Sequence, residues 1–416
     1  MSQVINTNVL SLTAQRNLNN NNNALQTSLQ RLSSGLRINS AKDDAAGLGI
    51  ADRFTSQING FRQAARNAND GISFSQTAEG ALSNINNNLQ RIRELAVQSS
   101  NATNSADDRR SLDNEVQQLI DEISRVANQS EFNGQAILDG TLSNLFFQIG
   151  ANQGQTIAVS GVDARTTQLG TQELVGTGVN QDELVASLKD DSLAFTGDIT
   201  ITVNGVESSG NVEITATLTD AKTFDDVVRQ LNDEIRKAAE KDDTGVVSEA
   251  NLKASLRVDN DGNTSVVINS AFKTAGSEGS GGGTVFTVSG GNVDGNAIDS
   301  TGLFSVTNNS GAVNLTEIDV TTRENAYETI TTVDGALNQI AGLRADLGAV
   351  QNRFEAAISN LGVAVENFSA SRSRIQDTDF AAETAELTRV QILQQAGTSV
   401  LAQANASQQN VLALLQ

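Results

Sequence analysis

Apolar residues recur at helical spacing at both ends of the chain. Near the C-terminus, apolar or small residues alternate in steps of three and four, at Val390, Leu393, Gly397, Val400, Ala404, Ser407, Val411 and Leu414. The N-terminal segment has a stripe of the same kind, at Ile5, Val9, Leu12, Leu18, Leu25, Leu29, Leu32 and Leu36. Such spacing is typical of a heptad seam. Neither stripe has an apolar partner within its own segment, so we expect the two to pack on each other, on other copies of the chain, or on both.

The positions beside these stripes carry few charges. Residues 1–42 contain four basic side chains and no acidic one, and residues 390–416 contain no charged side chain. A helix in water normally carries Glu and Lys on its outer face. A helix covered by partners avoids charges, because a desolvated, unpaired charge is costly. The pattern favours assembly; the alternative is a soluble amphipathic helix with a neutral outer face. The predicted polymerisation seam is Leu18, Leu25, Leu29, Leu32, Leu36, Val390, Leu393, Val400, Ala404, Val411 and Leu414.

Longer apolar stripes at helical spacing follow the N-terminal stripe along the sequence. After a break within residues 31–53, one stripe runs from 58 to 96, with a phase slip near Gly71. Ser105 is a candidate N-cap for a second helix, because Asp108 follows at the third helical position and the first turn is acidic. Asn133-Gly134 is expected to end this helix. The short alternating runs between residue 135 and about residue 170 indicate β-hairpins.

A third stripe begins near Arg323 and continues to Phe368. Residues 369–377 are expected to separate it from the C-terminal stripe. Three long stripes in two distant segments predict a helical bundle whose members come from both halves of the chain. So many consecutive heptads are typical of a rod rather than of a globular domain.

The middle of the chain has a different pattern. Residues 195–203, 212–216 and 265–268 are predicted strands, and residues 224–240 form one predicted amphipathic helix. The Gly/Ser-rich residues 277–284 are expected to be a loop or flexible link. Because both ends of this segment join the rod, it is predicted to be an inserted, solvent-facing domain.

The predicted fold is therefore mainly α, with terminal coiled-coil helices, a helical-bundle rod with a β-hairpin region, and an inserted outer α+β domain. We assign an N-terminal coiled-coil helix to residues 1–44 and a C-terminal one to 371–416. The rod takes residues 45–172 and 321–370, and the outer domain takes 173–320.

Composition narrows the possible functions. The net charge of −21 argues against binding to nucleic acid or to an anionic membrane. There is no apolar run of 18 residues and no recognisable signal peptide at the N-terminus. We therefore expect either a cytoplasmic protein or one that leaves the cell by a route without a cleaved signal.

The chain lacks Cys, His, Pro and Trp. Without Cys and His, disulfides, zinc sites and His-based catalytic triads are excluded. About twenty prolines would be average for this length, and their absence removes slow cis/trans steps from folding. These absences suit a chain that is kept unfolded and then folds quickly elsewhere.

Motifs that could carry chemistry are weak. Residues 259–264 loosely resemble a calcium loop, but Gly262 is at the fourth place rather than the sixth and Ser270 occupies the twelfth, so a tight hairpin turn is favoured. The glycines of 279–283 lack the Lys of a phosphate-binding loop. No nucleophile has a base beside it. We predict no catalytic, cofactor-binding or metal-binding residue, and no enzyme activity.

Several motifs resemble bacterial flagellin. They are Val4-Ile-Asn-Thr-Asn-Val9, Leu32-Ser-Ser-Gly-Leu-Arg-Ile-Asn39, Lys42-Asp-Asp-Ala-Ala-Gly47, Leu89-Gln-Arg-Ile-Arg-Glu-Leu-Ala96, Phe132-Asn-Gly134, Ser373-Arg-Ile375, Asp379-Phe380 and Asn410-Val-Leu412. The resemblance covers about residues 1–172 and 323–416, in the order that the family has. Two departures are Gly49, where Ala is more usual, and the final Gln416, where many members end in Arg.

The resemblance implies a filament subunit that polymerises with itself and serves swimming motility. It also implies that the terminal helices, residues 1–44 and 371–416, pair as a coiled coil that lines the filament core. It implies export in the unfolded state through the flagellar type III apparatus, folding under a filament cap, and an extracellular, secreted location in the flagellum. It also implies contact with hook-filament junction proteins and with a cytoplasmic export chaperone. Alternatives are a hook-filament junction protein, or a filament protein whose middle domain is an adhesin or an enzyme.

Arg91 and Leu95 share a helix face and lie one step from the core stripe of residues 89, 92 and 96, so we expect both to be at least partly exposed. On sequence alone, Leu95 is equally well explained as a scattered surface leucine. In flagellins that activate Toll-like receptor 5, the residues matching Arg91, Leu95 and Glu115 carry recognition. The resemblance therefore implies a receptor-binding site at these three residues.

Overall fold

The structure is a computed structural model that describes residues 7–180, 182, 187, 194–203, 212–242, 246–259, 261–271, 286–295, 298–309 and 311–413. The chain forms two compact units. The first unit comprises Met1–Asn69, Gln148–Ile157 and Glu355–Gln416, and the second comprises Asp70–Phe147 and Ala158–Phe354. The long helices α2 (Ala45–Ser99) and α7 (Arg323–Gln376) contribute residues to both units.

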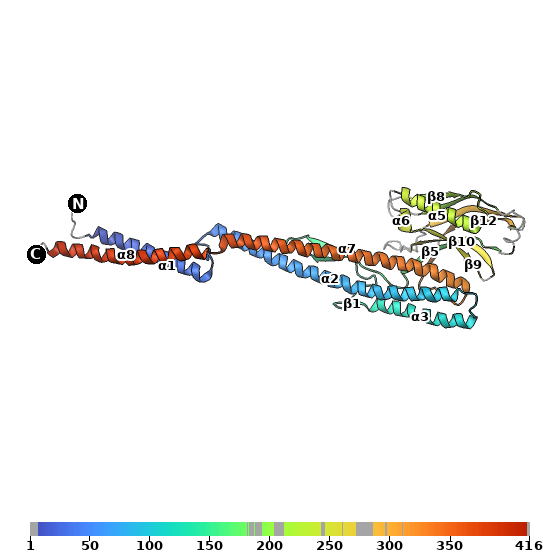
Figure 1. The fold of residues 1–416 in the computed structure, drawn as a ribbon, viewed down its shortest axis with the longest axis horizontal. Coiled ribbons are helices and arrows are strands. Elements are labelled where there is room, and N and C mark those ends of the chain that lie inside the picture. Colours follow the sequence, from blue (N-terminus) through green and yellow to red (C-terminus); the bar gives the residue numbers. More distant parts are fainter. Residues whose placement is uncertain are drawn as a thin grey trace. The chain divides into compact units, whose positions relative to one another are not determined.

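In the first unit, helix α1 (Val9–Ser34) lies antiparallel beside α8 (Phe380–Ala413), as Figure 1 shows. Helix α1 ends at Ser34, inside the predicted break at residues 31–53 and ten residues before the end of the segment 1–44 that was assigned to this helix. Gly35 adopts a left-handed conformation, with φ of 71°, and its N–H donates to the carbonyl of Arg31. This is the backbone geometry that glycine adopts without strain.

The break before α8 differs from the prediction. Helix α7 continues through Ser369 to Gln376, and only residues 377–379 separate it from α8. The carboxylate of Asp379 accepts the N–H groups of Ala381 and Ala382, which caps the new helix. The expected separating segment 369–377 is polar but contains no helix breaker, so the helix runs through it.

The segments of α2 and α7 in the first unit pack through aromatic side chains. The ring of Phe368 lies 5.3 Å from that of Phe54 and 5.6 Å from that of Phe61. Arg372 adds a hydrogen bond to the hydroxyl of Thr55. The apolar stripes that were read from sequence thus meet between two distant parts of the chain.

In the second unit, α3 (Ala106–Gln129) runs beside α2 (Figure 1). Ser105 is the N-cap, as predicted, and forms a capping box with Asp108. The helix ends four residues before Asn133-Gly134, which instead form the turn between β1 (Glu131–Phe132) and β2 (Gln135–Ala136). Strands β3 (Leu145–Gln148) and β4 (Thr156–Val159) pair as well, which confirms hairpins in this region.

Gly71 marks the predicted phase slip, although α2 continues through it without a break. A Cβ atom at this position would lie 2.5 Å from the ring of Phe354. Phe354 is fully buried and also contacts Phe147 edge-on at 5.5 Å. The glycine therefore makes room for an aromatic side chain of α7 where the apolar pattern changes phase.

The middle segment forms two antiparallel sheets. One has the order β13 (Gly311–Asn314), β5 (Gly170–Val175), β10 (Asn263–Ala271) and β6 (Val179–Asn180), with β9 (Lys253–Val258) also paired to β10. The other has the order β12 (Ile298–Asn309), β11 (Phe286–Gly295), β7 (Ala194–Val203) and β8 (Val212–Thr217).

Helices α5 (Phe224–Lys241) and α6 (Val246–Ala250) accompany these sheets, and one apolar cluster includes side chains from α5 and from both sheets. The predicted strands at 195–203, 212–216 and 265–268 and the predicted helix at 224–240 are confirmed. The Gly/Ser-rich residues 277–284 lie outside the described residues.

The predicted fold class is confirmed: long terminal helices, a helical region with hairpins, and an α+β insert. No helix in the described part of the chain is long and apolar enough to cross a bilayer.

Candidate functional site

The paired terminal helices are the strongest candidate for a functional surface. Each buries a narrow stripe against the other. On α1 the covered positions are Ser11, Ala14, Leu18, Leu25, Ser28 and Leu32; on α8 they are Val390, Gln394, Gly397, Leu401 and Ala404. Several of these residues are small, which allows close approach: a Cβ atom on Gly397 would lie 3.4 Å from Leu18.

The predicted seam divides between two environments. Val390 is only 1% exposed and Ala404 is also buried, whereas Leu18, Leu25, Leu32 and Leu36 are half-buried. Leu29, Leu393 and Val400 remain exposed, Val400 at 58%. The side chains of Val411 and Leu414 lie outside the described residues. The α1–α8 contact therefore covers only part of the heptad seam.

A set of large apolar side chains on these two helices stays in contact with water. Its members are Val9, Leu10, Leu12, Leu29, Phe380, Ile392, Leu393 and Val400. Apolar patches of this kind mark interaction surfaces when they are contiguous and large. Since residues 390–416 carry no charge, the surface is suited to burial against a further helix.

Two amide contacts cross between the helices. Asn8 Nδ2 donates to the carbonyl of Ala404 at 3.0 Å, and Gln394 Nε2 donates to Asn22 Oδ1 at 2.9 Å. Asn8 also caps α1, because its side-chain oxygen accepts the N–H of Ser11. Polar groups thus interrupt the apolar contact at separate levels along the pair.

A charged contact lies nearer the other end. Arg31 Nη1 is 3.8 Å from Glu383 Oε2, and Glu383 is the more buried partner. Beyond it, Leu36 and Asp377 form an antiparallel bridge, and Arg37 N–H donates to the carbonyl of Gln376. These contacts join the end of α1 and the residues after it to the end of α7, the α7–α8 connection and the start of α8.

The three candidate receptor residues occupy the second unit. Arg91 on α2 forms an ion pair with Glu115 on α3 at 2.9 Å and another with Glu94 at 3.0 Å. The hydrogen bonds to Glu94 and Glu115 raise the pKa of Arg91. The structure therefore brings Arg91 and Glu115 together on one exposed surface.

The expected exposure of Leu95 is wrong. Its side chain is 1% exposed. Arg91 and Ser99, one turn to either side of Leu95, both contact α3, through Glu115 and through Arg109 Nε. Leu95 lies between them on the same face of α2 and is covered. The exposed apolar neighbour is Val97, which the heptad pattern of α2 alone did not single out.

We next consider residues that could bind a metal ion. Within the described residues no group of three or more acidic side chains could hold a metal ion. The Asp259 carboxylate accepts the N–H groups of Asp261 and Asn263, and the Asp259 N–H donates to the Asn263 carbonyl. This is the tight turn between β9 and β10 that was favoured over a calcium loop.

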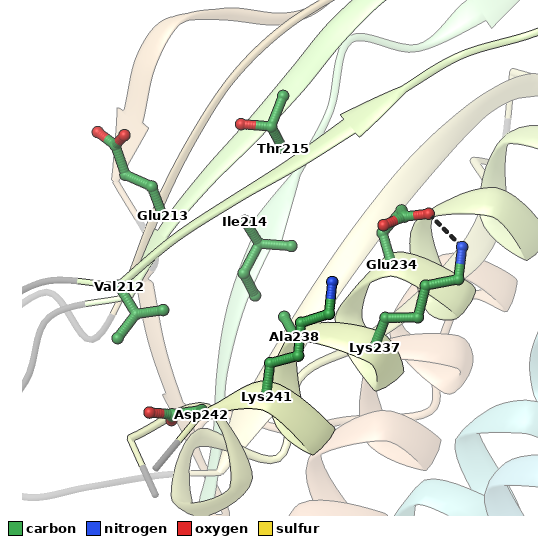
Figure 2. A pocket seen from close by; sticks show the side chains of 9 residues that line it. All are labelled: Val212, Glu213, Ile214, Thr215, Glu234, Lys237, Ala238, Lys241 and Asp242. Carbon is green, nitrogen blue, oxygen red and sulfur yellow. Dashed lines mark hydrogen bonds and ion pairs between the residues drawn. The ribbon is translucent and has the colours of Figure 1, made fainter. Parts of the chain in front are cut away.

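The insert contains a cavity of about 440 Å³ between β8 and α5 (Figure 2). Its charged lining side chains come from both elements, and two of them, Glu234 and Lys237, pair at 2.6 Å. The lining residues are Val212, Glu213, Ile214, Thr215, Glu234, Lys237, Ala238, Lys241 and Asp242. This set provides no activated nucleophile.

Comparison with known proteins defines the class. Residues 5–143 match the bacterial flagellin N-terminal helical region, and residues 330–415 match the bacterial flagellin C-terminal helical region. The chain belongs to the flagellin family, so it is a structural subunit of the extracellular flagellar filament, and the sequence resemblance is confirmed.

Relatives cover the whole chain. It is 39% identical to flagellin of Salmonella choleraesuis, with 100% of both chains covered. It is 39% identical to flagellin B of Vibrio anguillarum, with 99% of both chains covered. Among solved structures, FliC from Burkholderia pseudomallei has 23% identity and a TM-score of 0.35, covering 68% of this chain and 99% of that one.

Proposed function

We propose that this chain polymerises with itself through α1 and α8, and that the resulting filament serves swimming motility. The observation that carries the proposal is the exposed apolar surface on two helices that already share a buried stripe. Burying apolar surface stabilises association by about 25 cal/mol per Å². In a helical polymer each subunit presents the same surface to its neighbours. Because residues 390–416 carry no charge, burying them costs no desolvation of a charged group in any copy.

The route of export is part of the same proposal. The chain is carried unfolded through the flagellar type III apparatus, held beforehand by a chaperone, and folds beneath a filament cap. The absence of Cys and Pro supports this, because neither disulfide exchange nor proline isomerisation delays folding at the tip. Hook-filament junction proteins are the proposed partners at the filament base.

The main alternative is a hook-filament junction protein, which would cap filaments rather than extend them. Full-length identity of 39% to flagellins favours the extending role. A second alternative places an adhesin or an enzyme in the insert. Activity retained by an isolated fragment of residues 173–320 would support that alternative.

Removing residues 390–416 tests the proposed function. The truncated chain should remain folded and soluble but should not extend filament seeds, as seen by electron microscopy. We expect the unassembled full-length chain to have poorly ordered terminal helices, because one stripe alone cannot offset the entropy of ordering. Circular dichroism of the full-length and truncated chains then gives similar helical content before assembly. Normal filaments from the truncated chain would refute the role of α8.

We further propose that the surface around Arg91 and Glu115 is recognised by Toll-like receptor 5 of a host. The exposed ion pair between α2 and α3 supports this. Because Leu95 is buried, we propose that it stabilises the packing of α2 against α3 and does not contact the receptor directly. Recognition of this kind serves the host and not the bacterium.

A further inference from the structure

The apolar stripe on α8 does not by itself define how α8 aligns with α1. Val390, Gly397 and Ala404 are seven residues apart and all lie on the covered face. A shift of one heptad would place each on the site of the next, so small or apolar residues would still meet α1. Coiled coils resolve this ambiguity with polar residues at single core positions, at some cost in stability.

Polar residues of that kind lie between α1 and α8. The Asn22–Gln394 hydrogen bond at 2.9 Å and the Arg31–Glu383 contact at 3.8 Å both cross the pair. A shift of α8 by one heptad would place Leu401 opposite Asn22 and Val390 opposite Arg31. The opposite shift would place Leu387 opposite Asn22. Each shift leaves polar groups against apolar side chains, which is unfavourable.

We infer that Asn22, Gln394, Arg31 and Glu383 specify the register of the α1–α8 pair. They are positioning residues, whose contribution is alignment rather than stability. The inference rests on the proposed function, because the register decides which exposed apolar residues of α1 lie level with those of α8. A shifted pair would present a different surface to a second copy. Two other features could set the register: the backbone bridge between Leu36 and Asp377, and the hydrogen bond from Asn8 to the carbonyl of Ala404.

The test uses introduced cysteines, since the chain has none of its own. Leu18→Cys with Gly397→Cys reports the observed register, because Gly397 faces Leu18. Leu18→Cys with Ala404→Cys reports a one-heptad shift. An intrachain disulfide closes a long loop and changes the migration of the monomer band, so electrophoresis separates it from interchain dimers. The ratio of the two intrachain cross-links is measured after mild oxidation, in seeded filaments and in the soluble full-length chain.

Parent filaments should give the observed-register cross-link and little of the shifted one. With Asn22→Leu, Gln394→Leu, Arg31→Leu and Glu383→Leu combined, the shifted cross-link should rise to a yield comparable with the other, while helical content is kept. The matched control is Asn23→Leu with Gln395→Leu, which adds leucine at neighbouring exposed positions. It should leave the ratio at the parent value.

An unchanged ratio in the four-leucine variant overturns the inference and assigns the register to the contacts that this variant keeps, the Leu36–Asp377 bridge and the Asn8–Ala404 hydrogen bond. Loss of filaments together with a shifted ratio supports the inference, whereas loss of filaments with the parent ratio overturns it. If the parent itself forms no filaments, the proposed polymerisation fails. Oxidation of the soluble chain traps the pairs that its terminal helices form transiently, so the change of ratio between the soluble parent and the soluble variant still decides the register.

Discussion

Glu173 and Arg257 form a buried ion pair in the second unit. Arg257 Nη2 on β9 lies 2.6 Å from Glu173 Oε1 on β5, and the two side chains are only 8% and 4% exposed. The hydroxyl of Thr331 on α7 donates to the other carboxylate oxygen at 3.3 Å. The pair therefore lies where the sheet of the insert meets helix α7.

Removing one partner should be far more damaging than removing both. Glu173→Ala leaves Arg257 buried without a counter-charge and should lower the free energy of unfolding by about 3–5 kcal/mol. Glu173→Leu combined with Arg257→Met should be about as stable as the parent or more so, because no charge remains to be desolvated. Urea unfolding followed by circular dichroism measures both. The exposed pair Arg236–Glu240 is the control: Glu240→Ala should change stability by less than about 1 kcal/mol.

The same carboxylate predicts a pH dependence. Burial raises the pKa of Glu173 above its ordinary value of 4.5 and outweighs the lowering by Arg257. Glu328, a second acidic group on α7, also raises this pKa. A raised pKa means that the folded state binds the Glu173 proton more tightly than the unfolded state does. The resulting gain in the free energy of unfolding is complete below the pKa of Glu173 in the unfolded chain, and it is lost as pH rises through its pKa in the folded chain. The parent should therefore lose stability relative to Glu173→Gln as pH increases above about 4.5. A relative gain of the parent over that range would show that attraction to Arg257 dominates.

Substitutions at Val400 and Val390 should distinguish the contact of α8 with other subunits from its pairing with α1. Val400 is exposed and Val390 is covered by α1. Val400→Asp should raise the critical concentration for polymerisation by about two orders of magnitude, if the charge costs about 3 kcal/mol in each copy. In the soluble chain, oxidation traps transient pairing of α1 with α8, and the yield of the disulfide between Cys at 18 and 397 should be unchanged by Val400→Asp and lowered by Val390→Asp. Val400→Asn is the neutral control for size and polarity. Equal polymerisation of the Asp and Asn variants would show that no charge is buried at this position.

The insert should be dispensable for assembly if the strands that join it to the rod are kept. Strand β13 pairs with β5, and Gly311 lies opposite Glu173. Replacing residues 174–310 by Asn-Gly removes Arg257, so it is combined with Glu173→Gln to avoid an unpaired carboxylate. The change should convert these strands into a hairpin with a two-residue turn, and thinner filaments should still form. A longer deletion that includes residues 311–320 removes the Val320 carbonyl that accepts the hydroxyl of Ser99, and it should destabilise the rod. Failure of the shorter deletion at every concentration, in electron micrographs of seeded samples, would reveal an assembly contact within the insert.

Receptor recognition can be tested with the unassembled protein. Arg91→Ala with Glu115→Ala should reduce signalling in a Toll-like receptor 5 reporter assay while the circular dichroism spectrum is unchanged, because both side chains are exposed. Glu122→Ala with Arg125→Ala removes another exposed ion pair of α3 and should signal as the parent does. Leu95→Ala should instead lower thermal stability, by about 2–5 kcal/mol for a buried leucine. Full signalling by the variant that lacks Arg91 and Glu115 would mean that these residues do not form a receptor-binding site in this chain.

Local sequence signals predicted the elements well. The capping box at Ser105, the start of α7 at Arg323, and the strands and helix of the insert all follow from residue spacing and turn chemistry. The terminal stripes were also found, because a heptad repeat is a property of one helix.

Features that depend on a second helix were not predictable in the same way. The periodicity of α2 identifies one core face, but α3 covers another, and Leu95 lies beneath it. The heptad seam of α8 likewise does not show which residues face α1 and which remain exposed. The Glu173–Arg257 pair joins strands far apart in sequence, and neither residue is distinguished by its neighbours.

The hydrogen bond from Asn8 to the carbonyl of Ala404 joins residues 396 positions apart. A contact of such separation cannot form until synthesis has reached Ala404. A chain truncated before α8 would contain α1 without its partner helix, so the apolar stripe of α1 would remain exposed. On the proposed role, a subunit can therefore join the filament only after α8 has been synthesised and can pair with α1, so assembly selects against chains truncated before α8.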